Sequence, residues 1–290
     1  MSAGRPRLGL ALGGGAARGI AHVGVLKVLE EEGIRPDLIV GTSAGALTGV
    51  FLAAGVSPAR MRAWAEALRW PLLVRPLVSR AGLMSNDRLG RMLERALPAR
   101  TFDELHLPFA CMATDLETAE PVLLCEGDLL SALRASCAIP GLVVPVERDG
   151  RLLIDGGVAD NVPTAVTRLF GADIVVAVDV NRSYRPQRRP SNMLSILMHC
   201  YFALGRAAER VSTQRADLLI APDVADVGHD QLHRAREIIA AGEQAARAAL
   251  PELRRLLERA IAATPSRPSA HTARAVCGTR ILEEPSEAAA

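Results

Sequence analysis

Short apolar runs alternate with longer segments in which apolar residues recur every three or four positions, over most of the chain. The first run spans 7–12, a helical stripe of apolar positions follows over 20–32, and a second run spans 38–41. Such runs are typical of buried strands, and the stripe is typical of an amphipathic helix. A strand, a helix and a strand within about 35 residues form a βαβ unit, which places the two strands in parallel.

The pattern further along the chain predicts one α/β domain without internal repeats. It predicts helices over 46–54, 58–68, 86–97, 128–137, 163–170, 192–214 and 230–263, the last as one or two helices. It predicts strands over 109–114, 122–125, 173–180 and 217–221, and a hairpin of 142–146 and 152–154 joined by Asp149-Gly150. Residues 70–84 are expected to be irregular. The domain is expected to span 1–263, and the Pro-, Ser-, Ala- and Arg-rich segment 264–290 is expected to be a disordered tail.

The composition narrows the class of protein. Hydrophobic residues make up 49% of the 290 positions, which is enough for a substantial core. The formal net charge of +2 argues against nucleic acid as the main partner. The five cysteines are scattered without a C-x-x-C pair or a metal-ligand spacing, which favours a cytoplasmic protein. Neither a signal peptide nor a membrane-spanning helix is expected, because no apolar run has the length or the flanks of either.

A small-residue turn with a central serine lies between the second strand and the next helix. Its sequence, Gly41-Thr42-Ser43-Ala44-Gly45, has the G-x-S-x-G pattern of a nucleophile elbow. The turn is so tight that Gly41 and Gly45 must nearly lack side chains, and its strain lifts the hydroxyl of Ser43 out of the sheet. Ser43 is therefore a candidate nucleophile.

A glycine-rich loop, Gly13-Gly14-Gly15-Ala16-Ala17-Arg18-Gly19, follows the first strand and is typical of an anion site. A nucleotide P-loop is excluded, because Ile20-Ala21 stands where Lys and Ser or Thr are required. A dinucleotide fingerprint is disfavoured, because Arg18 occupies its third glycine position and Asp37 precedes the next strand. The remaining interpretation is an oxyanion hole, since neighbouring parallel strands place this loop and Ser43 at the same edge of the sheet.

The base that would activate the serine is less clear from the residues. His22 is the one histidine near the glycine loop, and a packed or solvated helix residue is its favoured interpretation. Asp115, Asp155 and Asp179 each follow an apolar run, and turn hydrogen bonding is favoured for the first and the last. Asp155 stands out because Gly156 and Gly157 allow a close approach, although spacing alone does not choose firmly among the three. An ordinary carboxylate is a weak base for serine, but burial raises its pKa.

Three ordered blocks, 13–19, 41–45 and Asp155-Gly156-Gly157, resemble the patatin-like phospholipase family in its small bacterial form. Supporting stretches are 82–85, 113–118, 134–136 and 138–141, and the similarity covers about residues 7–222. The resemblance implies a three-layer α/β sandwich with a mainly parallel central sheet. It also implies a hydrolase of lipid acyl esters that uses a Ser–Asp dyad without histidine, metal or cofactor. By position, Ser43 would be the nucleophile and Asp155 its base. The amides of Gly14, Gly15 and Ala16 would form the oxyanion hole, supported by Gly13, Arg18, Gly19, Gly41, Gly45, Gly156 and Gly157.

Two positions depart from the pattern of the family. Ala16 stands where many members have glycine, and its methyl group is accommodated if its φ angle is negative. Ser136-Cys137 stands where members often have Ser-Ser, which we interpret as a change in packing.

The expected partner is a lipid or lysolipid, with peripheral contact to a membrane as a further expectation. Segment 70–78 is interpreted either as an apolar lip at a bilayer, with Arg75 and Arg80 on phosphates, or as an ordinary covering connection. Residues 193–204 are expected first as a buried helix face and only second as a membrane contact. The arginines of 182–189 are expected as a solvated loop, with contact to anionic headgroups as the second interpretation. The alternative from another class is a regulatory or scaffold protein that keeps the fold to bind a partner. Ser43 and Asp155 together argue against it.

Overall fold

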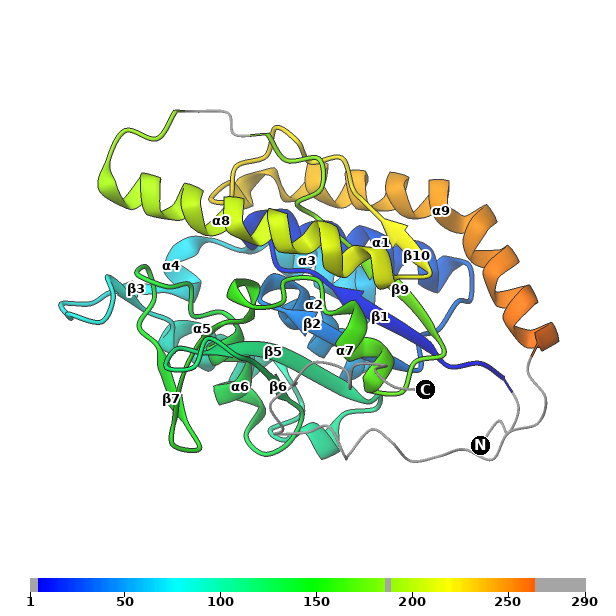
Figure 1. The fold of residues 1–290 in the computed structure, drawn as a ribbon, viewed down its shortest axis with the longest axis horizontal. Helices are drawn as coiled ribbons and strands as arrows, with labels where there is room; N and C mark the ends of the chain where they lie inside the picture. Colours follow the sequence, from blue (N-terminus) through cyan, green and yellow to red (C-terminus); the bar gives the residue numbers. More distant parts are fainter. Residues whose placement is uncertain (1–4, 186–188, 264–290) are drawn as a thin grey trace, which may run out of the picture.

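A mixed sheet runs through the middle of the computed structural model, with helices packed on both of its faces (Figure 1). The structure describes residues 5–185 and 189–263. The strands are β1 Leu8–Leu12, β2 Leu38–Thr42, β3 Arg75–Pro76, β4 Met84–Ser85, β5 Phe109–Asp115, β6 Pro121–Leu124, β7 Val146–Arg148, β8 Arg151–Asp155, β9 Ile174–Val178 and β10 Leu218–Ile220. The α-helices are α1 Ala21–Glu31, α2 Ala44–Ala53, α3 Pro58–Ala67, α4 Trp70–Leu73, α5 Asp87–Ala96, α6 Leu129–Ser136, α7 Thr164–Leu169, α8 Met193–Ser212 and α9 Ala235–Ala263. Short 3₁₀ helices are η1 Ala16–Ile20, η2 Phe102–Glu104, η3 Gly156–Val158, η4 Thr213–Arg215 and η5 Leu232–Arg234.

The strand order of the large sheet is β10-β9-β1-β2-β5-β8-β7, and β6 pairs with β5 outside this path. Strands β10, β9, β1, β2 and β5 run parallel to one another. Strands β6 and β8 pair antiparallel with β5, and β7 pairs antiparallel with β8. The expected three-layer sandwich with a mainly parallel sheet is confirmed. The carboxyl ends of β1 and β2 lie side by side, because Leu12 pairs with Gly41.

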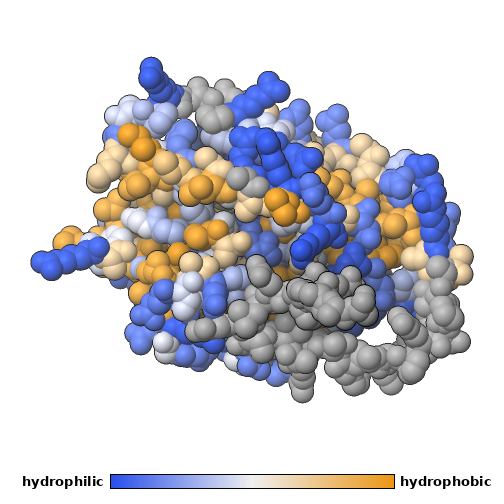
Figure 2. Space-filling view, in the orientation of Figure 1, coloured by the Kyte–Doolittle hydropathy of each residue, from blue (hydrophilic) through white to orange (hydrophobic). Residues whose placement is uncertain are grey.

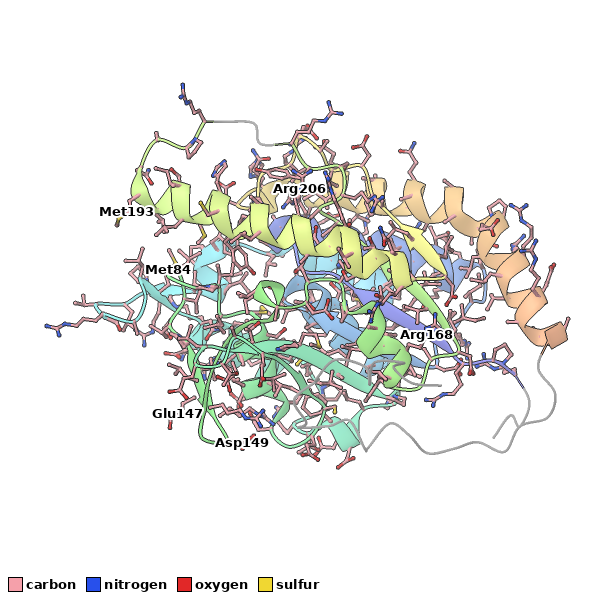
Figure 3. The ribbon with its side chains drawn as sticks, viewed as in Figure 1. Met84, Glu147, Asp149, Arg168, Met193 and Arg206 are labelled. Atoms are coloured by element: carbon pink, nitrogen blue, oxygen red, sulfur yellow. The ribbon has the colours of Figure 1, made fainter. Side chains whose placement is uncertain are left out.

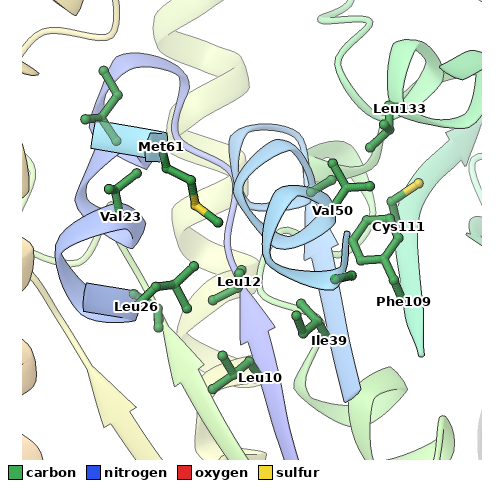
Figure 4. Packing of buried hydrophobic residues seen from close by; sticks show 14 of the residues in the cluster. Leu10, Leu12, Val23, Leu26, Ile39, Val50, Met61, Phe109, Cys111 and Leu133 are labelled. Atoms are coloured by element: carbon green, nitrogen blue, oxygen red, sulfur yellow. The ribbon is translucent and has the colours of Figure 1, made fainter. Parts of the chain in front are cut away.

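The core is divided between the two faces of the sheet by the alternation of side chains along each strand. Leu10 and Leu12 of β1 pack in the larger cluster, against helices α1, α2 and α3 (Figure 4). Ala11 points the opposite way, into a smaller cluster that Val166 and Phe170 help to form beside α7. All five residues of β1 are buried, as expected for a parallel strand covered on both sides.

Most predicted elements are present within a few residues of their expected bounds. Helix α3, for example, begins as predicted, with Ser57 as its N-cap and Pro58 as its first residue. The first strand of the predicted hairpin is wrong, since β7 lies at Val146–Arg148 and not at 142–146. Residues 142–144 instead exchange backbone hydrogen bonds with Met84 of β4. Segment 70–84, expected to be irregular, contains the short elements α4, β3 and β4. The predicted tail 264–290 lies outside the described residues.

Candidate active site

Ser43 occupies a strained backbone conformation between β2 and α2. Its φ and ψ angles are 51° and −117°, in a region that residues other than glycine rarely adopt. A Cβ atom on Gly41 would lie 2.6 Å from the amide nitrogen of Ala46, and one on Gly45 would lie 2.1 Å from the carbonyl oxygen of Leu12. Both glycines are therefore required by close backbone approaches. The amide of Ser43 donates to the hydroxyl of Ser136 (2.9 Å), which holds the turn against α6.

The glycine loop after β1 leaves two amides available beside Ser43. The N–H of Gly14 donates to the carbonyl of Asn161 at 3.3 Å, whereas the N–H groups of Gly15 and Ala16 form no hydrogen bond among the described residues. Gly15, Ala16 and Ser43 line one small cavity of about 20 Å³, which has room for about one water molecule. Of the three amides expected to form an oxyanion hole, the structure leaves those of Gly15 and Ala16 free to do so.

Ala16 has a φ of 50°, and so the condition of a negative φ is not met. The left-handed conformation costs alanine about 1–2 kcal/mol, which glycine avoids. The N–H of Ala16 nevertheless lies at the start of η1, where helical N–H groups have no partner within the helix. Alanine at position 16 therefore adds strain to the loop but keeps the backbone N–H donor at that position.

Arg18 is fully buried and ties the loop to distant parts of the chain. Its guanidinium lies 3.8 Å from the ring centre of Tyr184 and contacts Nε2 of His229. Burial lowers the pKa of Arg18 to about 10, and burial and the nearby Arg18 charge lower the pKa of His229 to about 2. The imidazole is therefore neutral at ordinary pH, and its Nε2 can accept a hydrogen bond from the guanidinium.

Asp155 ends β8 with its carboxyl group directed at the serine turn. Its Oδ1 accepts hydrogen bonds from the amide of Gly157 (2.8 Å) and the hydroxyl of Tyr201 (3.1 Å). Its Oδ2 accepts no hydrogen bond from the described residues. Burial raises the pKa of Asp155 to about 6, and the nearby hydroxyl of Ser43 is the strongest of the groups that lower it. Ser43 and Asp155 also line the same small cavity, so the structure brings the two predicted groups together.

The other candidates for the base have structural roles. His22 is fully buried, its Nε2 contacts the carbonyl oxygen of Gly13 at 2.7 Å, and burial lowers its pKa to about 4. Asp115 and Asp179 accept hydrogen bonds from backbone amides two residues further on, at 3.0 and 2.9 Å. The favoured interpretations of all three, a packed histidine and two turn aspartates, are confirmed.

Three buried side chains that the sequence did not single out set the direction of the glycine loop. The amides of Asn161 and Asn181 both donate to the carbonyl of Gly14, at 3.2 and 2.9 Å, and both donate to Glu209 of α8. In a trans peptide the C=O and the following N–H point in opposite directions. Holding the carbonyl of Gly14 therefore turns the N–H of Gly15 away from Glu209. Burial raises the pKa of Glu209 to about 7.

Tyr201 and Cys137 complete the surroundings of the pair, and sequence reasoning missed the first of them. Tyr201 comes from α8, 46 residues after Asp155, and nothing in its local sequence marks it. Burial and the charge of Asp155 raise the pKa of Tyr201 well above its ordinary value, so its hydroxyl stays protonated and donates. The thiol of Cys137 lies against Ser43, and burial likewise raises its pKa. Cys137 is therefore a neutral neighbour at ordinary pH.

A large groove of about 1690 Å³ opens from Ser43 across the molecule. Apolar side chains of several helices line most of it, among them Leu47, Phe51, Trp64, Leu73, Met198 and Phe202. Arginines also line it, namely Arg60, Arg88, Arg91, Arg95, Arg189 and Arg206. The expected lip at 70–78 contributes Trp70 to Val74 to the groove, whereas Arg75 pairs with Asp87 at 2.8 Å.

Within the described residues, no helix combines the length and apolar character needed to cross a bilayer. No cluster of three or more histidine, cysteine, aspartate or glutamate side chains in the same part of the chain could hold a metal ion.

The sequence of the chain is similar to one family model and to several known proteins. A family model described as Patatin-like phospholipase matches residues 10–168. An uncharacterized NTE family protein of Mycobacterium bovis is 39% identical over 181 residues, which are 61% of this chain and 50% of that protein. Patatin-like phospholipase domain-containing protein 6 of Homo sapiens is 35% identical over 184 residues, which are 60% of this chain and 13% of that protein. The chain thus matches at most half of the length of these relatives.

One solved structure agrees with the fold. The crystal structure of VipD from Legionella pneumophila matches with a TM-score of 0.51 at 14% sequence identity, over 86% of this chain and 67% of that one. At this identity the likeness concerns the fold alone.

Proposed function

Since the chain belongs to the patatin-like phospholipase family, we propose that it is a serine acyl hydrolase that cleaves carboxylic esters of lipids. The reaction is of the phospholipase A or lysophospholipase type. The free Oδ2 of a buried carboxyl beside a strained serine is the observation that carries this proposal. The family and the name of the human relative support the class of substrate.

In the proposed reaction the Ser43 Oγ attacks the ester carbonyl while Asp155 Oδ2 takes the hydroxyl proton. Because Gly157 and Tyr201 occupy Oδ1, the lone pairs of Oδ2 remain available for this proton. A pKa of about 6 makes Asp155 a stronger base than an ordinary aspartate, while it is still ionised at neutral pH.

The oxyanion that forms would be held by the N–H groups of Gly15 and Ala16, each such donor typically contributing about 3–4 kcal/mol. Collapse of the tetrahedral intermediate breaks the ester C–O bond, and the proton on Asp155 goes to the departing alcohol oxygen. A water molecule, deprotonated by the same carboxylate, then cleaves the acyl-enzyme and restores Ser43. These steps use no metal and no cofactor.

The groove beside Ser43 fits an acyl chain because it is large and mostly apolar. A substrate of this kind comes from a membrane or a micelle, so the proposal includes peripheral contact with a lipid surface.

A fluorophosphonate probe tests the proposal directly. Wild-type protein should be labelled at Ser43 and should hydrolyse p-nitrophenyl butyrate, and Ser43→Ala should do neither. Asp155→Asn keeps the shape but removes the base, and its hydrolysis rate should fall by about 10²–10⁴-fold. Circular dichroism and thermal unfolding of each variant confirm that the fold is intact. If folded wild-type protein takes up no probe and cleaves no ester, the alternative of a regulatory or scaffold protein replaces this proposal.

A further inference from the structure

Helix α8 carries a stripe of apolar side chains on its outward side that no described part of the chain covers. Met193 is 77% exposed and Leu204 is 73% exposed. We call this set the outer stripe, and its members are Met193, Ile196, Leu197, Cys200, Leu204 and Val211. They recur at the three- and four-residue spacing of one helix face. Figure 2 shows hydrophobic residues along the course of α8 on the face of the molecule turned to the viewer.

Helix α8 contacts the groove through residues other than those of the outer stripe. Leu194, Met198 and Phe202 line the groove, and Tyr201 donates to Asp155. Helix α8 is therefore apolar on two sides, and only one of them faces the protein. An exposed apolar face on a helix that also walls a groove is typical of an interaction surface.

Exposed apolar side chains are also present on the opposite wall of the groove. Leu72 of α4 lines the groove and is 51% exposed. Leu83 is half exposed and precedes Met84, which lines the groove as well. Figure 3 shows Met84 and Met193 at the same end of the molecule. The groove is therefore bordered by exposed apolar residues on both of its walls.

The charges of α8 select among possible occupants of this surface. Its one acidic residue, Glu209, is buried and bonded to Asn161 and Asn181. The charge that the helix presents therefore comes from Arg206, which is half-buried at the groove, and from Arg210, which is exposed. Arginines suit the phosphates of lipid headgroups.

We propose that the outer stripe of α8, together with Leu72 and Leu83, docks onto a phospholipid bilayer that contains anionic lipids. The 20 residues of α8 give it a length of about 30 Å, enough to lie in the plane of the interface with its apolar side inserted. The proposal builds on the proposed function, because the groove between the two docked walls then opens toward the membrane that supplies the acyl chain.

Co-sedimentation with vesicles tests this surface. The vesicles contain phosphatidylcholine alone or phosphatidylcholine with phosphatidylglycerol, and the test protein is Leu197→Glu/Leu204→Glu. Neither leucine lines the groove. The matched control is Leu169→Glu/Ile261→Glu, which places the same charges at exposed apolar positions on α7 and α9. The stripe variant should bind the anionic vesicles at least about tenfold more weakly than wild type, and the control should bind as wild type does.

Hydrolysis of soluble p-nitrophenyl butyrate separates this proposal from the proposed function. The stripe variant should hydrolyse it at the wild-type rate but lose activity on vesicle phospholipid. If no protein hydrolyses the soluble ester while vesicle binding still depends on the stripe, docking stands and the hydrolase proposal fails. Equal vesicle binding by wild type and stripe variant overturns docking. Analytical ultracentrifugation that shows a wild-type dimer broken by the same substitutions also overturns it, in favour of a second copy.

Discussion

The two walls of the candidate site are built from different parts of the chain and in different ways. On one wall, the turns after β1 and β2 present backbone groups, and close approaches at Gly41 and Gly45 fix their shape. On the other wall, Asp155 and residues of α8 meet through side chains, across 46 positions in the case of Tyr201. The first wall depends on the absence of side chains, whereas the second depends on particular donors and acceptors. Substitutions should therefore affect the first mainly through stability and the second mainly through the chemistry of the carboxyl group.

The largest effect is expected for Gly45→Ala on the backbone wall. The new methyl group would lie 2.1 Å from the carbonyl oxygen of Leu12, and neither strand nor turn can move without breaking the pairing of β1 with β2. The free energy of unfolding should fall by roughly 3 kcal/mol, with loss of ester hydrolysis. Urea unfolding followed by circular dichroism measures this fall.

Gly90→Ala in α5 is the matched control for this substitution. The nearest atoms to its added Cβ belong to the flexible side chain of Arg134, and alanine is favoured in a helix interior. Its stability should stay within about 1 kcal/mol of wild type. Equal losses in the two variants would mean that the turn after β2 is no more constrained than an ordinary helix.

A smaller and different effect is expected for Tyr201→Phe on the side-chain wall. The hydroxyl of Tyr201 lowers the pKa of Asp155 by donating to Oδ1, so its removal raises that pKa above about 6. Because the ionised carboxylate is the proposed base, the rate of hydrolysis rises as the pH rises through its pKa. The midpoint of this rise in kcat/KM should move to higher pH by about half a unit to one unit.

Tyr184→Phe controls for the loss of a buried phenol. Tyr184 lies against Arg18, and its hydroxyl donates no hydrogen bond to Asp155 in the structure. Its pH profile should keep the wild-type midpoint. A Tyr201→Phe profile with an unchanged or lower midpoint would show that the phenol does not act on the carboxyl.

The contrast between the walls also explains what the sequence could predict. Backbone requirements leave local marks, because a tight turn needs glycine at fixed offsets from Ser43, and the order of apolar runs predicts the parallel sheet. Side-chain partners from distant elements leave no such mark. Tyr201 and Glu209 lie in a helix whose pattern marks neither of them, and Asp155 could be chosen firmly over Asp115 and Asp179 only through the family resemblance.

The prediction of a hairpin strand over 142–146 is wrong for a related reason. Its apolar residues satisfy the strand pattern, but in the fold they bond to Met84, a partner almost sixty positions away that the local pattern does not contain. A short apolar run thus predicts that a segment is extended without predicting where its hydrogen bonds go.

The smallest effect is expected for Ala16→Gly, which acts on the backbone wall without touching a side chain of the other. With a φ of 50°, Ala16 carries strain of about 1–2 kcal/mol that glycine would release. The greater freedom of glycine in the unfolded chain offsets about 0.5–1 kcal/mol of this gain. Urea unfolding should therefore show a net gain of roughly 0.5–1 kcal/mol. Ala17→Gly, at a buried neighbour whose φ is not positive, should instead lose stability. Both variants keep the N–H of residue 16, so a loss of hydrolysis in Ala16→Gly alone would show that the strain itself holds that donor toward the substrate.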